Sequence, residues 1–385
     1  MPSVRRQLPL TLLDGIVIVL ASAAVVIFLG GRTQMTVLGL RVLLFSPWPL
    51  AVLAITLGVV RLTIAPRTNV LPALPNHTGS DAFRLARTRF IVPPQRPRAF
   101  WMYAAAAVAG SLLWLTPHLL HPRLVIDPGD PIFSAWRLGR FARQLAHDPR
   151  HLFDGKIFYP AAHTLTYSDA TVLEGLVAAP FVLAGADPLT VSNVLSLASF
   201  PLNALAFFYA GWRLTLDARA AVIAGILGAL YPFHWEHYSH LELQFTCFIP
   251  LALVALLCWL AKPTVRRAAT LGIIVTAQWL ACMYFGLMLL IFLLPFAVIM
   301  AIAWRVRPDL QLARSTISAA VIVGSGFAAL GFPYMQSRNA RGDRPFPLVA
   351  YFSATAGEYL HPSGRLAAPP GMTTPLAANS TRRQL

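Results

Sequence analysis

The chain has 385 residues, of which 57% are hydrophobic and only 12% are charged, and its mean hydropathy is +0.62. These values exclude an ordinary soluble domain and are typical of a polytopic membrane protein. The formal net charge of +16 comes mostly from arginines that lie between apolar segments and form no continuous basic stripe, so we expect no nucleic-acid partner.

Apolar segments along the chain predict an all-α bundle of about nine spans, since about 20 apolar residues cross a bilayer as a helix. The segments lie near residues 12–30, 47–64, 99–117, 189–212, 220–233, 243–261, 268–284, 286–304 and 315–332. Between the first two, residues 32–46 are rich in β-branched and apolar residues around Leu38-Gly39. This pattern predicts a short hairpin at the outer surface.

Arginines between these segments predict the orientation of the chain. Arg5 and Arg6 precede the first span, and the loop 65–98 carries six arginines against one acid, Asp81. Shorter basic turns follow near 213–219, 262–267 and 305–314. Because basic loops stay in the cytoplasm, we predict a multi-pass membrane protein with a cytoplasmic N-terminus.

This topology brings residues 118–185 and 234–242 to the same external side. It requires that residues 171–185 do not cross the membrane; they are short for a span, hold Glu174, and suit a helix at the outer interface. A true short span is the alternative. Residues 132–147 combine aromatic and aliphatic side chains with arginines at helical spacing, which predicts an interfacial amphipathic helix.

The chain therefore divides into three predicted parts. Residues 1–98 form a two-span extension with a basic cytoplasmic loop, and residues 99–335 form the main transmembrane module with its external loop. Residues 336–385 form an external polar segment and a tail. The tail is predicted to be disordered, because residues 362–385 are rich in proline, alanine and threonine without periodicity.

The external segment opens with Asp127-Pro128-Gly129-Asp130, which places two of only fifteen acids three residues apart just beyond a span. Asp127 and Asp130 are therefore candidate catalytic residues. Either carboxylate could act as a general base or bind a divalent metal such as Mg or Mn that is held by a donor's phosphate. The alternative is a plain turn, since Asp, Pro and Gly are the residues that turns use.

A second polar cluster, HWEHYSHLELQ at residues 234–244, lies between two spans. Ionisable groups at such density are costly unless they are used or solvated. Three interpretations remain open: metal ligands, the polar wall of an outward-facing cavity, or a loop at the aromatic belt of the membrane. The candidate ligand-binding residues are His234, Glu236, His237, His240 and Gln244.

Basic side chains of the external segment are candidates for a phosphate or a lipid headgroup, because guanidinium groups bind phosphate in a bidentate manner. The candidates are Arg123, Arg137, Arg140 and Lys156, with Arg213 on the other side. Asp154 and Asp169 flank a segment rich in aromatic residues and belong to the same external module.

Four stretches carry a resemblance to a known superfamily: GDPIFSAWRLGR (129–140), LFDGKIFYPAAHTLTYSD (152–169), ALYPFHWEHYSHLELQ (229–244) and AQWLACMYFG (277–286). Over roughly residues 99–360 the chain resembles an uncharacterised bacterial branch of the GT-C membrane glycosyltransferases. That branch is similar to polyprenyl-phosphate-sugar-dependent mannosyltransferases and aminoarabinose transferases.

The resemblance implies a location in the inner membrane of a bacterium and a donor sugar on a polyprenyl phosphate that enters from the outer leaflet. Asp130 or Asp127 would deprotonate the acceptor hydroxyl, which would attack the anomeric carbon with inversion, and Glu236 and His240 would orient the acceptor or the phosphate. Nearby cations or a metal would stabilise the charge on the leaving phosphate. The family usually continues well past residue 385, so the resemblance also predicts that the chain is truncated.

Two other classes of function remain as alternatives. A transporter or flippase of a lipid or polyol predicts inverted repeats and ionisable residues near the bilayer midplane. We find no inverted repeat in the sequence, and the acids cluster at one face, which favours an enzyme. An inactive, truncated membrane protein is the third alternative.

Overall fold

A computed structural model describes residues 33–37, 40–44, 87–125, 129–342 and 345–351. The chain divides into two compact units, one of residues 1–81 with 345–385 and one of residues 82–344. The predicted spans near 12–30 and 47–64, the tail 362–385 and Asp127 lie outside the described residues.

In the first unit, β1 (Thr33–Val37) and β2 (Leu40–Leu44) pair in an antiparallel hairpin. Thr33 lies opposite Leu44, and Val37 lies opposite Leu40. The predicted hairpin over residues 32–46 is thus confirmed, and it adds a strand pair to a chain that was otherwise expected to be all-α. The described part of this unit also holds the short helix α15 (Phe346–Tyr351).

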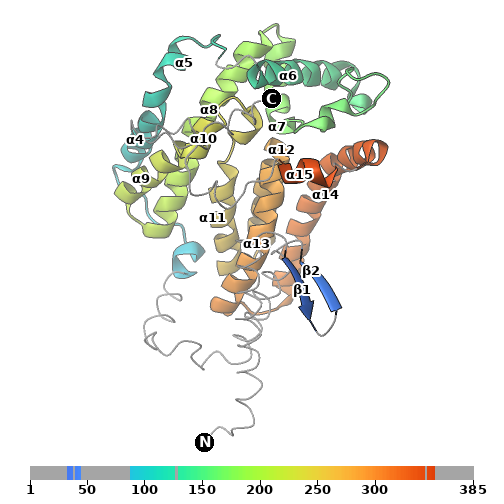
Figure 1. Ribbon diagram of the computed structural model, residues 1–385. Coiled ribbons are helices and arrows are strands. Elements are labelled where there is room, and N and C mark those ends of the chain that lie inside the picture. The colour runs from blue at the N-terminus through green and yellow to red at the C-terminus, as the bar shows by residue number, and fades with distance from the viewer. Residues whose placement is uncertain (1–32, 38–39, 45–86, 126–128, 343–344, 352–385) are drawn as a thin grey trace, which may run out of the picture. The chain divides into compact units, whose positions relative to one another are not determined.

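Every secondary-structure element that the structure describes in the second unit is a helix (Figure 1). Its α-helices are α4 (Phe100–Leu112), α5 (Thr116–Leu120), α6 (Asp130–His147), α7 (Val172–Leu183), α8 (Pro188–Thr215), α9 (Ala218–Ala229), α10 (Pro232–Glu236), α11 (Phe248–Ala261), α12 (Val265–Ala281), α13 (Met283–Ala303) and α14 (Leu310–Arg341). Short 3-10 helices are η1 (Leu113–Leu115), η2 (Pro149–His151), η3 (Thr164–Tyr167) and η4 (Leu241–Leu243). The helices predicted over 132–147 and 171–185 are confirmed as α6 and α7.

Four helical segments of the described chain are long and apolar enough to cross a membrane: Pro188–Thr215, Leu241–Ala261, Met283–Ala303 and Leu310–Arg341. The other helices that fall on predicted spans are shorter, with 13 residues in α4, 12 in α9 and 17 in α12. A helix rises about 1.5 Å per residue, so these fall short of a bilayer core of about 30 Å. The prediction of about nine spans is met only for these four segments.

Large apolar side chains on α13 and α14 lie on the surface of the second unit. On α13 the exposed residues include Leu287, Met288, Ile291, Phe292 and Leu294, and α14 exposes Ile317, Val321 and Phe332. An apolar surface of this extent is rare on soluble monomers. It suits contact with lipid and agrees with a membrane protein.

Close packing joins α4, α8 and α9. The aromatic rings of Phe100, Phe208 and Trp212 meet edge to face, with centroids 4.7 to 5.2 Å from that of Phe100. A Cβ atom at Gly211 would lie 2.9 Å from the Cβ of Ala224. The missing side chain therefore lets α8 and α9 approach each other closely.

Arginines cap helix C-termini at one end of the second unit. Arg87 donates to the carbonyl of Ala261, at 3.2 and 3.3 Å, and to that of Trp304, at 2.9 Å. These carbonyls lie at the C-terminal ends of α11 and α13, where unpaired C=O groups and the helix dipole favour a cation.

Further arginine contacts at the same end of the second unit involve residues 89–91, which follow Arg87 in the chain. Arg89 donates to the carbonyl of Leu214 in the last turn of α8, Arg213 to that of Arg89, and Arg267 to those of Phe90 and Ile91. Basic segments that the charge pattern assigned to one side of the membrane thus meet in space. We call this region, defined by Arg87, Arg89, Arg213 and Arg267, the arginine end.

At the opposite ends of these helices, the loop between α6 and α7 contacts the residues that begin α13, and α6 contacts those before α11. Asp169 accepts from the backbone of Met283, and Arg137 pairs with Glu242. Figure 1 shows α5, α6 and α7 toward the top of the view, while α11 and α13 extend downward. We call this region, defined by Asp130, Asp169, Glu174 and Glu242, the acidic end.

Candidate functional site

Asp130 is the first residue of α6, where Pro131 follows with its fixed φ angle. Its Oδ2 lies 3.1 Å from Nε2 of His240, and both side chains are partly open to solvent, with relative exposures of 51% and 35%. Asp130 thus contacts the 234–244 cluster, a segment that the predicted topology placed on the same side of the membrane. An acid and an imidazole in contact at a solvent-accessible surface can exchange protons with a bound ligand.

His234 holds the start of this cluster in place. It is fully buried, with Nδ1 2.8 Å from the carbonyl of Ala229 and Nε2 3.3 Å from the hydroxyl of Thr246. Burial lowers the pKa of His234 to about 4, so the ring is neutral at physiological pH. His234 therefore ties α9 to the segment before α11 and is not available to a ligand.

Gln244 and His237 also serve the local fold. The Gln244 side chain is buried and donates to the carbonyl of His237 at 2.5 Å, and Asn203 of α8 donates to the carbonyl of Gln244 at 2.8 Å. The His237 ring stacks on Phe233, with centroids 4.1 Å apart. Glu236 ends α10 and is half-buried. Among the imidazoles of the cluster, His240 is the one that faces Asp130.

Arg137 is buried and has a structural role. One guanidinium nitrogen donates to Glu242 at 2.6 Å and to Ser134 at 2.9 Å, and another donates to the carbonyl of Asp169 at 2.5 Å. The group also lies over the ring of Phe133. These bonds join α6, the loop between α6 and α7, and η4, and they engage the guanidinium group that the sequence suggested for binding a phosphate.

Asp169 and Glu174 are buried acids beside this pair. Asp169 accepts from the backbone of Met283 at 2.7 Å and of Thr171 at 3.1 Å, and so it caps the start of α13. Burial raises the pKa of Asp169 to about 6 against the opposing effect of these two bonds. Burial also raises the pKa of Glu174 well above its usual range, and neither of its carboxyl oxygens has a hydrogen-bond partner within the described structure.

The loop between α6 and α7 carries the remaining candidates. Arg140 donates to the carbonyl of Asp154 at 3.1 Å, and Asp154 accepts from the backbone of His163 at 2.6 Å. Lys156 is exposed and has a positive φ of 55°. Thr171 also has a positive φ, of 46°. Such angles are unusual for residues other than glycine and are often found at functional sites.

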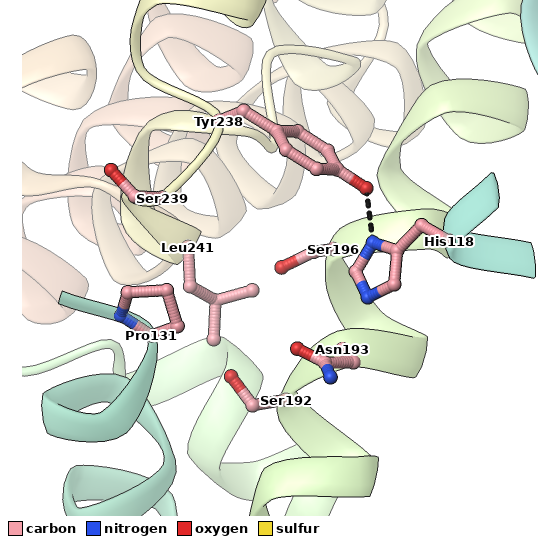
Figure 2. A pocket seen from close by; sticks show the side chains of 8 residues that line it. All are labelled: His118, Pro131, Ser192, Asn193, Ser196, Tyr238, Ser239 and Leu241. Atoms are coloured by element: carbon pink, nitrogen blue, oxygen red, sulfur yellow. Dashed lines mark hydrogen bonds between the residues drawn. The ribbon is translucent and has the colours of Figure 1, made fainter. Parts of the chain in front are cut away.

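A small polar pocket lies near the Asp130–His240 pair, and the free space among its side chains is about 10 Å³, room for about one water molecule. Pro131, next to Asp130 in the sequence, and Ser239, next to His240, are among its lining residues. Figure 2 shows its side chains converging from α5, α6, α8 and the segment after α10. The lining consists of His118, Pro131, Ser192, Asn193, Ser196, Tyr238, Ser239 and Leu241.

The sequence contained a signal for this pocket that the motif analysis missed. Polar residues recur along the apolar helix α8 at intervals of four, three and four: Ser192, Ser196, Ser199 and Asn203. This is the spacing of one helix face. His118 and Tyr238, by contrast, lie 120 residues apart and only the fold brings them together.

A metal centre is not formed by the described residues, which bring together no group of three or more His, Cys, Asp or Glu side chains suited to a metal ion. Asp130 and His240 alone do not make a complete ligand set for Mg or Mn, which prefer several oxygen ligands.

Comparisons with protein-family models, with curated proteins and with solved structures gave no match for this chain. The functional argument therefore depends on the geometry of the site.

Proposed function

We propose that this protein is a membrane glycosyltransferase that moves a sugar from a polyprenyl-phosphate carrier to an acceptor hydroxyl at the outer face of the inner membrane. The observation that carries the proposal is the contact of Asp130 with His240 beside a polar pocket, at one end of an apolar helix bundle. Acids that gather at one end suit an enzyme whose lipid substrate enters from one leaflet.

In the proposed reaction Asp130 is the general base. The acceptor hydroxyl gives its proton to the Asp130 carboxylate, and the acceptor oxygen forms a bond to the anomeric carbon of the donor sugar. The bond between that carbon and the phosphate oxygen breaks on the opposite face, and the lipid phosphate leaves with the electron pair. His240 holds the carboxylate through Oδ2 and acts as a positioning residue.

Charge builds up on the leaving phosphate, so a nearby cation would stabilise the transition state. Among the candidates from the sequence, Arg137 is paired with Glu242, whereas Lys156 and Arg123 are exposed. We assign the phosphate contact to these two exposed side chains. Their role is testable separately from that of Asp130.

Substitution of the base tests the proposal. Because a positioned general base contributes about 10²–10⁴-fold in rate, Asp130→Asn should remove nearly all transfer from radiolabelled polyprenyl-phosphate sugar in membranes that contain the protein. His240→Gln should lower kcat while the KM for the donor stays unchanged. The matched control is Asp217→Asn, which alters an N-cap of α9 far from the site and should retain transfer. Near-normal transfer by Asp130→Asn would refute the assignment.

The predicted orientation has its own test. We expect a cysteine at position 159, where Tyr159 is 96% exposed on the external loop, to react with an impermeant reagent added to whole cells. A cysteine at position 262, where Lys262 follows α11, should react only after permeabilisation. The background must lack Cys247, Cys258 and Cys282. The reverse pattern of labelling would contradict the outer-face location.

The buried acids favour a second candidate, a transporter or flippase, because ionisable groups inside a membrane protein often serve transport. Glu174 lacks a hydrogen-bond partner within the described structure and lies near Asp169. Purified protein in lipid vesicles distinguishes the two candidates. Movement of a labelled polyprenyl-phosphate sugar between leaflets, blocked by Glu174→Gln and without any transfer to acceptors, would favour transport.

A further inference from the structure

The loop between α6 and α7 has an exposed, uncharged tip, which we define as residues 158–162. Tyr159 is 96% exposed and Phe158 is 66% exposed, and the other three residues of the tip are exposed as well. The tip thus presents two aromatic rings beside proline and alanine, with no charged side chain among them. Apolar surface that is gathered in this way often marks a contact with a partner or a membrane.

Hydrogen bonds close the base of this loop. The backbone of His163 donates to the Asp154 carboxylate at 2.6 Å, and the backbone of Gly155 donates to the hydroxyl of Thr164 at 3.0 Å. Phe158 and His163 have positive φ angles of 59° and 55°. Such angles are unfavourable for residues other than glycine, so they occur where the surrounding contacts impose them. The loop therefore presents its tip on a defined turn.

The loop is attached to the C-terminal part of α14, beside which Figure 1 shows it. The hydroxyl of Tyr334 donates to the carbonyl of Ser168 at 2.7 Å. Further along α14, the guanidinium of Arg341 lies 3.8 Å from the centroid of the Tyr167 ring. The Phe158 ring of the tip stacks on the same Tyr167 ring, with centroids 5.7 Å apart. A chain of contacts thus connects the tip to the end of α14.

The length of α14 sets the level of these contacts in a bilayer. Between Arg314 and Arg338 the helix carries no charged residue. At about 1.5 Å per residue this stretch is about 35 Å long, close to the thickness of a bilayer core, about 30 Å. Phe332 and Met335, near its end, are exposed apolar residues that suit contact with lipid. Tyr334 and the loop that it binds therefore lie where α14 leaves the core of the membrane.

We propose that the tip is a membrane anchor, which inserts Phe158 and Tyr159 among the lipid headgroups of the leaflet that borders the acidic end. Aromatic rings favour this region, and a tyrosine there keeps its hydroxyl in water while its ring contacts the lipid. The anchor fixes the level of the loop that follows α6, the helix that begins with Asp130. It does not depend on the glycosyltransferase reaction and needs only that the long apolar helices cross a bilayer.

The continuity of the tip with the apolar surface of α14 favours lipid over a soluble partner. Tyr334, which binds the loop, lies between Phe332 and Met335 in the chain, so the lipid-facing surface of α14 extends to the level of the loop. The headgroup region is in contact with water. A cysteine at position 159 therefore remains open to an impermeant reagent in this arrangement.

Fluorescence quenching of the full chain in lipid nanodiscs tests the anchor. A nitrobenzoxadiazole label on Ala162→Cys, in a background without the three native cysteines, leaves both aromatic rings of the tip in place. We expect strong quenching by lipids with a nitroxide on the headgroup and weaker quenching by lipids with a nitroxide near the end of an acyl chain. A label on Ile291→Cys, on the exposed surface of α13, should show the opposite order. A label on Arg150→Cys, at an exposed position outside the tip, should be quenched less by both lipids.

Removal of the two rings tests their role directly. Phe158→Ser with Tyr159→Ser should remove most of the headgroup quenching at position 162, whereas Ile132→Ser, at an exposed apolar position of α6, should leave it unchanged. Elution of each variant from a sizing column in detergent checks that the protein stays folded. Quenching at position 162 no stronger than at position 150, or unchanged quenching in the double serine variant, would overturn the anchor and leave the rings to a soluble partner. Transfer activity is not read in this experiment, so either outcome leaves the proposed function standing.

Discussion

The arginine end and the acidic end of the second unit use polar side chains in different ways. At the arginine end, Arg87, Arg89 and Arg213 donate to backbone carbonyls. These hydrogen bonds satisfy carbonyls at helix termini, which would otherwise lack partners. At the acidic end, side chains pair with each other, as Asp130 does with His240 and Arg137 does with Glu242. Here several buried groups have no partner at all among the described residues, including His118 Nε2 and both oxygens of Glu174.

The arginine contacts have a structural role, whereas the acidic end pairs ionisable side chains beside the proposed base. Nearly all buried polar groups in proteins are hydrogen-bonded, so an unpartnered one needs an explanation. Arg213 Nε and Trp304 Nε1 at the arginine end have no partner among the described residues, and neither do His118 Nε2 and the two Glu174 oxygens at the acidic end. The two ends differ in where these atoms lie, because His118 lines the pocket near Asp130 and Glu174 lies near Asp169.

The largest effect on stability is expected at the acidic end, from Arg137→Met. The substitution leaves Glu242 buried without its partner, and breaking a buried pair costs about 3–5 kcal/mol. Thermal unfolding of the purified protein in detergent should show a large drop in Tm, and adding Glu242→Gln should recover part of it. Arg266→Met, at an exposed position of α12, is the control and should change little. Equal stability of the two single variants would remove the contrast between the buried and the exposed arginine.

The second-largest effect is a dependence of stability on pH that comes from the carboxyl group of Asp169. Its pKa is about 6 in the folded protein and about 3.8 as the ordinary value, so the folded state binds more protons between these pH values. Stability is therefore highest below about pH 4 and falls, for this group alone, by about 3 kcal/mol as pH rises through 6.

Comparison with Asp169→Asn isolates this contribution. The variant loses one of two backbone contacts at every pH, but the difference in Tm between it and the wild type should change across pH 4 to 7 in the variant's favour. A difference that stays constant with pH would show that Asp169 is not shifted by burial.

The smallest effect is expected at the arginine end. Arg87→Gln removes charged hydrogen bonds to Ala261 and Trp304 and should cost about 1–2 kcal/mol, measured by the same thermal unfolding. Transfer activity should not change. Arg307→Gln, at an exposed position, is the control. Loss of transfer in Arg87→Gln would mean that the two ends are coupled, and the comparison would need revision.

The positions of helices could largely be predicted from the sequence. Each predicted span beyond residue 98 coincides with a helix, and α6 and α7 were expected from their amphipathic and short apolar patterns. Hydropathy alone did not predict the lengths of these helices. In α9, for example, Asp217 caps the start of the helix, and the chain turns at Pro232 shortly after its end. The sequence therefore predicted where the longer helices lie, but not the short helices such as α10 and not the number of crossings.

The roles of the polar residues were predicted less well. Arg137, His234 and Gln244 were reasonable ligand candidates by residue type, but each is buried and bonded within the chain. Residue type cannot distinguish an arginine that binds a phosphate from one that binds a buried glutamate, because both use the same donors.

What the sequence determined by itself is the class of the protein and the segregation of its charges. Low charge and high hydropathy require a membrane, and the placement of arginines and acids in alternate loops follows from local composition. The tertiary structure decided which polar groups pair. The contacts between Asp130 and His240 and between His118 and Tyr238 each join segments more than a hundred residues apart, and such pairing depends on helix packing, which no local pattern encodes.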